Sequence, residues 1–165
     1  MEVKDLTPQV VWRNFYSLTQ IPRPSGKTQR VAQFLVDFAQ SHGADAHIDE
    51  AGNVLIHKPA TKGFEKKAVT MLQAHMDIVA QKTKDSKHNF DTDPLDVYVD
   101  GDWVTARDTT LGADDGMGVA AAMAIIEDDS VEHGPLEILI TRDEETGMDG
   151  AFGLKPGILK SKYLS

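Results

Sequence analysis

The N-terminal part of the chain carries apolar side chains at the three- and four-residue spacing that is typical of amphipathic helices. The first stripe, from Val11 to Leu18, follows a Thr7-Pro8 pair, a common helix start in which the hydroxyl caps the first turn. The second stripe predicts a helix from about residue 28 to Gly43, since glycine often ends helices. We interpret both helices as scaffold.

Shorter segments with strand-like composition follow the two helices. Residues 46–50 and 54–58 are joined by a glycine-containing link, which predicts a hairpin. Residues 68–74 are mostly apolar and do not alternate, which predicts a strand buried on both faces. Residues 96–99 and 103–105 flank an Asp-Gly turn and predict a second hairpin.

A helix between two apolar strands indicates the fold class. Residues 112–118 form a glycine-rich stretch that opens a helix over 119–127, and residues 136–141 predict the strand that follows. Strand, helix and strand in this order form the parallel crossover unit, so we predict an α/β domain with a mixed, partly parallel sheet flanked by helices. In such sheets, ligands bind beyond the carboxyl ends of the strands.

Composition narrows the class of protein. The 165 residues are 41% hydrophobic and 26% charged, the balance of one soluble globular domain. The formal net charge of −9 argues against nucleic acid or an anionic membrane surface as a partner. Cysteine is absent, so a metal would have to bind through His, Asp and Glu. Because there is no secretory leader and no apolar run of roughly 20 residues, we expect a cytoplasmic protein.

Acidic side chains are concentrated between Asp85 and Asp149. This segment holds 18 Asp and Glu, but only Lys87, Arg107 and Arg142 as cationic residues. A solvated acidic surface is the simplest interpretation, because runs of charge usually face water. A cation site is the alternative wherever several carboxylates are packed together.

Two motifs place possible metal ligands at the ends of predicted elements. His75 and Asp77 follow an apolar strand. A lone histidine is commonly an ordinary buried polar residue, but a nearby carboxylate is the usual partner that orients a metal-bound imidazole. Asp114 and Asp115 lie in the glycine-rich stretch, where they could equally cap the helix. That stretch has neither the glycine spacing of a Rossmann loop nor the residues of a Walker loop.

A third motif, Asp143-Glu144-Glu145, follows the last apolar strand. Three consecutive acids are compatible with a plain polar loop. Adjacent carboxylates also suit metal-assisted hydrolysis, in which one binds the metal and its neighbour takes a proton from water. Each motif alone is a weak signal, whereas their order on successive strand-helix units indicates a hydrolase.

Together these motifs resemble the M20 family of metallopeptidases. The similar stretches are His75-Met76-Asp77, Thr109 to Gly118, Asp143 to Leu154, and residues 52–56 and 133–137. Within the family, the chain is most similar to the aminoacyl-histidine (Xaa-His) dipeptidase branch. The resemblance implies a zinc-peptidase catalytic domain of the phosphorylase/hydrolase-like fold. It also implies hydrolysis of unblocked dipeptides, especially carnosine-like dipeptides that end in histidine.

The same resemblance implies roles for five side chains. His75 would be a ligand of one zinc ion, and Asp77 would orient its imidazole. Asp114 would bridge two metal ions, with a cis peptide bond after it, and the next aspartate would have no ligand role. Glu144 would be the general base that deprotonates a bridging water, and Glu145 would be a ligand of the second ion. The cofactor is thus a pair of divalent ions, zinc in the first place, although the same ligands accept cobalt or manganese.

The resemblance further implies that residues 1–165 are the N-terminal part of the catalytic domain. Two zinc ions need about four ligands each, and the only carboxylate after Glu145 is Asp149. The family carries another carboxylate ligand just past a strand that begins at Tyr163, a distant histidine, a lid or dimerisation domain and a C-terminal catalytic segment. We therefore expect the 165 residues alone to be inactive and the full-length protein to be a homodimer.

Two other functions remain open from the sequence. A non-catalytic acidic module that binds divalent cations or a basic partner would explain the charge, but not why the motifs fall at element ends. Another M20 member, such as a tripeptidase or a deacylase, would share the motifs and differ in the residues that grip the substrate.

Overall fold

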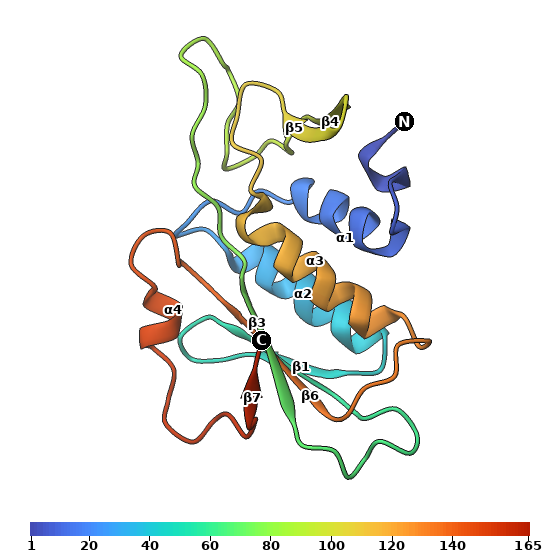
Figure 1. The fold of residues 1–165 in the computed structure, drawn as a ribbon. Helices are drawn as coiled ribbons and strands as arrows, with labels where there is room; N and C mark the ends of the chain where they lie inside the picture. The colour runs from blue at the N-terminus through green and yellow to red at the C-terminus, as the bar shows by residue number, and fades with distance from the viewer.

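The computed structural model describes residues 1–165 as a sheet with a layer of helices on one face, and with a separate two-stranded hairpin beyond the helices (Figure 1). In chain order the elements are η1 (Val3–Asp5), α1 (Gln9–Thr19), α2 (Gln29–Ser41), β1 (Asp45–Ile48), β2 (Val54–Lys58), β3 (Thr70–His75), β4 (Val97–Asp100), β5 (Trp103–Ala106), α3 (Ala113–Glu127), β6 (Leu136–Thr141), α4 (Asp149–Phe152) and β7 (Tyr163–Leu164). None of the helices is both long enough and apolar enough to cross a membrane.

The five-stranded sheet is mixed, with the strand order β1-β2-β6-β3-β7. β3 pairs in parallel with β6 and with β7, whereas β2 pairs antiparallel with β1 and β6. β3, α3 and β6 form the predicted crossover unit, so the carboxyl ends of β3 and β6 lie at the same edge of the sheet. The predicted α/β fold with a partly parallel sheet is confirmed.

The main hydrophobic core lies between the sheet and the helices. Val54 and Ile56 on β2 and Ile138 and Ile140 on β6 belong to it, because alternate side chains of a strand point to the same face. α2 packs on β1 and β2, while α3 is sandwiched between β3 and α1. This sandwiching explains why α3 is apolar nearly all round.

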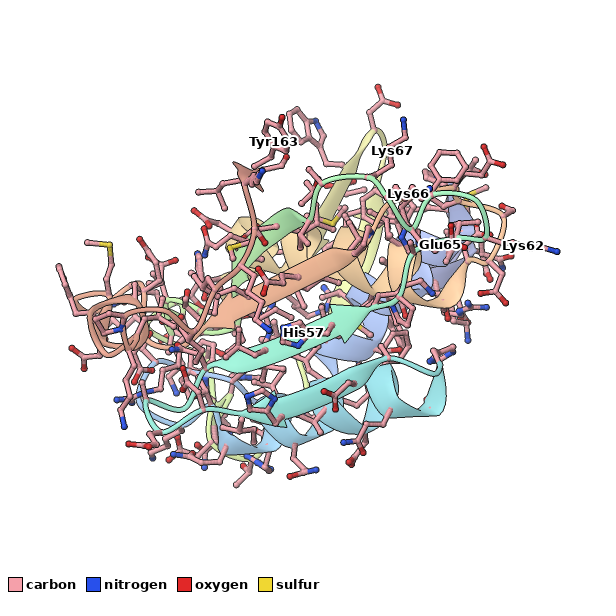
Figure 2. The ribbon with its side chains drawn as sticks, turned by 90° about the horizontal axis from the view of Figure 1, so that it is seen from below. His57, Lys62, Glu65, Lys66, Lys67 and Tyr163 are labelled. Atoms are coloured by element: carbon pink, nitrogen blue, oxygen red, sulfur yellow. The ribbon has the colours of Figure 1, made fainter.

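The opposite face of the sheet carries a smaller cluster of Leu55, Met71 and Leu139. Side chains from the segment after α4 pack against this cluster. Figure 2 looks at this face and shows His57 on β2. The loop from β2 to β3 carries Lys62 and lies at the end of the sheet where β3 begins, away from the carboxyl ends of β3 and β6.

Helix starts differ in detail from the sequence-based predictions. Pro8 is the N-cap of α1, and no side chain supplies a capping hydrogen bond, so the predicted role of the Thr7 hydroxyl is wrong. α3 begins at Ala113 rather than at residue 119, with non-helical backbone angles at Asp114 and Asp115. Because glycines have low helix propensity, the start of this helix could not be recognised from periodicity.

The expected burial of β3 on both faces is also only partly right. Met71 and Ala74 are buried, whereas Gln73, on the face that no helix covers, is exposed, and Thr70 at the start of the strand is half-buried. α4 is absent from the sequence-based predictions because its four residues are too few to show a helical period.

Candidate metal centre

Three segments that are distant in sequence converge at the carboxyl ends of β3 and β6. His75 is the last residue of β3 and pairs with Thr141, the last residue of β6, so the loops that follow both strands begin side by side. The start of α3, which carries Asp114, reaches the same place, with Asp114 Oδ1 3.0 Å from His75 Nε2. The predicted gathering of polar side chains at the strand ends is therefore present.

His75, Asp114 and Glu145 form a group that could hold a metal ion. One ligand atom from each residue lies within 4.8 Å of the other two. His75 is buried, whereas the side chain of Asp114 is 86% exposed, so the group is open to solvent on one side. An imidazole nitrogen with two carboxylate oxygens is a donor set that zinc and related divalent ions accept.

Asp77 is fully buried and links the two strand ends. Its Oδ1 accepts the backbone N–H of Glu144 at 3.0 Å, and its Oδ2 accepts the backbone N–H of Glu145 at 3.2 Å and the hydroxyl of Ser25 at 2.7 Å. Oδ1 also lies 3.4 Å from His75 Nδ1, which is ion-pairing distance without hydrogen-bond geometry, so this carboxylate lies beside the imidazole and Nε2 is left for a ligand. Burial acts to raise the pKa of Asp77, but these donors together lower it to about 2.

Negative charge is in excess at the site, where several carboxylates surround one imidazole. Burial by itself lowers the pKa of His75, but the carboxylates of Asp77 and Asp114 raise it to about 9. Burial raises the pKa of Glu145, and the negative charges of Asp114 and Glu144 add to this effect against the opposing charge of His75. The imidazolium is therefore the counter-charge of these carboxylates, a role that a divalent cation would take over on binding.

The two adjacent aspartates have different surroundings. Asp115 accepts the backbone N–H of His75 at 3.2 Å and that of Gly118 at 3.1 Å, so it joins β3 to α3 and caps the regular part of the helix. Asp114 instead faces solvent and His75, and the peptide bond between the two aspartates is cis, as the family resemblance implied. Only Asp114 is thus available to a ligand.

Glu144 lies beside the ligand group without belonging to it. Its Oε2 is 3.9 Å from His75 Nε2, its side chain is 41% exposed, and its backbone N–H is bound by Asp77. A carboxylate in this place can take a proton from a water molecule held by the group.

Two cavities border the ligand group, and both are lined by Val79 and Glu145. One has a volume of about 350 Å³ and extends along Ile78. The other, of about 280 Å³, extends along Leu111 to Asp114. The group therefore lies between two spaces that a small ligand could enter.

Several side chains that support the site were not recognised from the sequence. Ser25 donates to Asp77, and the buried Asp143 accepts the backbone N–H of Gly26 at 2.6 Å. Arg23 lies in the same turn as Ser25 and Gly26 and is fully buried, and this burial lowers its pKa to about 10. The only local signal is the Pro-rich turn of residues 21–26, which contains Arg23, Ser25 and Gly26.

A sequence model of peptidase family M20/M25/M40 matches residues 71–163, which include every proposed site residue from His75 to Glu145. The chain belongs to this family. Members of peptidase family M20 are metal-dependent hydrolases of peptide bonds, so a metal at the group described above is in keeping with the family.

M20 relatives resemble the chain over almost all of its length. The cytosol non-specific dipeptidase of Escherichia coli K12 is 47% identical over 163 residues, which are 99% of this chain and 34% of the relative. The crystal structure of aminoacylhistidine dipeptidase from Vibrio alginolyticus superposes with a TM-score of 0.97 at 47% identity, again over 99% of this chain and 34% of the other. A Staphylococcus aureus tripeptidase shares the fold, with a TM-score of 0.79 at 24% identity over 96% of this chain and 43% of its own. The chain thus spans about a third of the length of the dipeptidases it matches.

Proposed function

We propose that the protein carrying this chain is a metal-dependent dipeptidase. The observation that carries the proposal is the convergence of His75, Asp114 and Glu145 within 4.8 Å, with Glu144 beside them. Metal-assisted hydrolysis of an amide needs a set of nitrogen and oxygen ligands and a neighbouring base, and these four side chains provide both. Two proteins that are 47% identical to the chain bear the name dipeptidase, which supports this choice among peptidases.

We propose that the centre holds two divalent ions, with zinc as the first choice and cobalt or manganese as alternatives. His75 would bind one ion, Glu145 the other, and Asp114 both, because its solvent-facing carboxylate has two oxygens. Bound ions would polarise the scissile carbonyl and lower the pKa of a water molecule.

The chain's own residues would then position that water and move its proton. Asp77 keeps Nδ1 of His75 on its own side, so that Nε2 faces the ligand group. Glu144 would accept the proton of the attacking water and donate it to the amine nitrogen as the C–N bond breaks. Its backbone N–H is fixed by the buried Asp77, which holds this base next to the ligands.

Three side chains provide fewer donors than two ions require, which is about four each. We therefore propose that further ligands come from polypeptide outside these 165 residues, which form the N-terminal part of the catalytic domain. A lid or dimerisation domain and a C-terminal catalytic segment would complete a homodimeric enzyme. The 165 residues alone should hydrolyse dipeptides slowly or not at all.

The proposed substrate is an unblocked dipeptide, in particular one with a C-terminal histidine. The name of the Vibrio protein indicates this specificity for a relative, and the two cavities on either side of Glu145 leave space for small side chains. The free amino group of a dipeptide also suits the acidic surroundings of the site. A cytosolic location, as in the name of the Escherichia coli relative, agrees with a role in the breakdown of small peptides.

The test compares the intact protein with its Glu144→Gln variant, measuring both zinc content and hydrolysis of Xaa-His dipeptides. We expect the variant to keep its zinc and to lose about a hundredfold or more in turnover, because only the proton acceptor is removed. Glu132→Gln is the matched control, since Glu132 is an exposed acid of the same acidic segment and should keep full activity.

Each alternative function has its own outcome in this experiment. A wild-type protein that binds zinc but hydrolyses no peptide would identify a cation-binding module instead. Faster cleavage of tripeptides or of N-acyl amino acids than of dipeptides would favour the tripeptidase or deacylase alternative.

A further inference from the structure

Arg23 lies in the turn between α1 and α2 and is only 1% exposed, which makes it the bulkiest fully buried side chain of the chain. No carboxylate lies within ion-pairing distance of its guanidinium group. Its two terminal nitrogens donate to backbone carbonyls instead: Nη1 to Met76 at 2.9 Å and Nη2 to Gly112 at 2.8 Å.

These two carbonyls belong to the two segments that carry the proposed metal ligands. Met76 stands between His75 and Asp77 at the end of β3, and Gly112 is two residues before Asp114. One planar group therefore spans from the first ligand segment to the second. Because the guanidinium is rigid and both of its terminal nitrogens are engaged, it sets the separation of the two backbones more narrowly than a flexible side chain could.

The surroundings of Arg23 are fitted to this bridge. A Cβ atom added to Gly116 would lie 2.6 Å from Nη2, and one added to Gly112 would lie 3.0 Å from the same nitrogen. The backbone of Arg23 is also fixed, since its carbonyl accepts the N–H of Ile78 at 3.1 Å. Both ends of the side chain are thus tied to the segment that runs on from β3.

The burial of a cation without a carboxylate partner is unfavourable, and its donors offset this cost only where they find acceptors. Nη1 and Nη2 of Arg23 donate to main-chain carbonyls at the edge of the candidate centre, whereas the buried Nε has no hydrogen-bond partner. An apolar residue of similar size would fill the same space, but it would remove the Arg23 donor from the Met76 carbonyl and leave the Gly112 carbonyl with only the N–H of Gly116. The negative charges of Asp77 and Asp115 favour the charged form of Arg23, and its two hydrogen bonds join the two ligand segments at a fixed spacing.

We infer that Arg23 is a positioning residue of the metal centre, which holds His75 and Asp114 at the separation that ion binding needs. This inference rests on the proposed function, because it presupposes that these two side chains are ligands. It predicts that changes at Arg23 weaken metal binding more than their effect on folding would explain.

The experiment measures the zinc dissociation constant of the intact protein by competition with a chromophoric chelator, well below the thermal midpoint of each variant. Arg23→Lys keeps the positive charge but cannot donate to both carbonyls in the same plane. Leu35→Ala is the control, because Leu35 is fully buried in the same core and belongs to neither ligand segment. Gly116→Ala is a second probe, since the added Cβ would lie 2.6 Å from Nη2 of Arg23 and would displace the guanidinium without removing it, although it would also approach the Phe15 ring at 3.1 Å.

We expect Arg23→Lys and Gly116→Ala each to raise the zinc dissociation constant at least fivefold more than Leu35→Ala does. In the Arg23→Lys background, Gly116→Ala should have less effect than in the wild type, since both changes act on the same contact. If Arg23→Lys does not fold, the zinc dissociation constant of Gly116→Ala, compared with that of Leu35→Ala, decides the question alone. A smaller excess than fivefold overturns the positioning role while the proposed function stands. A wild-type protein that binds no zinc overturns both.

Discussion

Replacing Asp77 with asparagine would remove a negative charge from the centre of the site while keeping the size of the side chain. Asp77 is fully buried and accepts hydrogen bonds from the Ser25 hydroxyl and from the backbone N–H groups of Glu144 and Glu145. In the variant, the new amide group has one acceptor oxygen where the carboxylate had two. We therefore expect the metal-free protein to lose stability even though no space is created.

The size of the loss follows from the pKa of Asp77, which is about 2 in the folded protein and about 3.9 in an unfolded chain. One pKa unit corresponds to about 1.4 kcal/mol, so ionised Asp77 contributes on the order of 2 to 3 kcal/mol to the free energy of unfolding at neutral pH. The pKa of His75, raised to about 9, describes the contact with Asp77 from the other side. The pKa shift of His75 is larger than that of Asp77 because Asp114 also contributes to it. Because both shifts describe the same contact, the free energy from the His75 shift is not a second contribution on top of that from Asp77.

The contribution of Asp77 to stability falls as the pH is lowered, because the pKa of Asp77 is lower in the folded protein than in the unfolded chain. The contribution of Asp77 is complete above about pH 4, falls to about half near pH 3, and disappears as the pH drops through 2. The other carboxylates titrate in both proteins, so their effects cancel in the difference between wild type and Asp77→Asn.

The assay is denaturant unfolding of both proteins in the presence of a metal chelator, from pH 7 down to the lowest pH at which both are folded. Asp96→Asn is the control, because the ion pair of Asp96 with Arg107 is exposed and its loss should leave the denaturation midpoint unchanged. A loss of stability for Asp77→Asn below about 1 kcal/mol at pH 7, or one that does not shrink in acid, would contradict the stabilising role of the Asp77 charge.

Three further predictions concern the sheet and the metal. Glu137→Gln should lower the free energy of unfolding by about 2 kcal/mol at pH 7, because the buried carboxylate accepts hydrogen bonds from two backbone N–H groups and from the Ser161 hydroxyl. These donors lower the pKa of Glu137 despite its burial, so the difference in stability between wild type and variant should shrink below about pH 4.5. Urea unfolding at several pH values measures this difference. Gly150→Ala should lower the free energy of unfolding by about 2 kcal/mol or more, and with it the thermal midpoint, since the added Cβ would lie 2.1 Å from Asn53 Oδ1. An unchanged thermal midpoint would contradict this prediction. Zinc affinity should rise about tenfold per pH unit between pH 6 and 8, because zinc binding must displace the proton that His75 holds with a pKa of about 9. Calorimetry in buffers of different ionisation enthalpy should find about one proton released per zinc ion bound. A zinc affinity that does not change with pH would contradict this expectation.

The local pattern of the chain was sufficient for the order and type of most elements. Val54 to Lys58 form a strand as predicted, and the crossover from β3 through α3 to β6 follows from two apolar strands with an apolar helix between them. The motif residues His75, Asp114 and Glu145 could be named in advance because they stand at element ends and resemble a family pattern.

What the pattern did not reveal depends on contacts between distant segments. Arg23 and Ser25 appeared as parts of a turn, and nothing within a few residues of either shows that one reaches Met76 and the other Asp77. The different surroundings of Asp114 and Asp115 are equally invisible in sequence, since both are acids in the same glycine-rich stretch.

By itself, the sequence determined the type and order of most elements and the acidic chemistry, because side-chain period and residue type are properties of short segments. The ligand candidates followed from motifs that resemble a family pattern. Only the tertiary structure decided that one aspartate faces solvent beside His75 while its neighbour caps α3. It also decided that a buried carboxylate joins the two strand ends and that a buried arginine spans the ligand segments. These outcomes depend on hydrogen-bond partners and burial, which exist only once segments far apart along the chain are packed together.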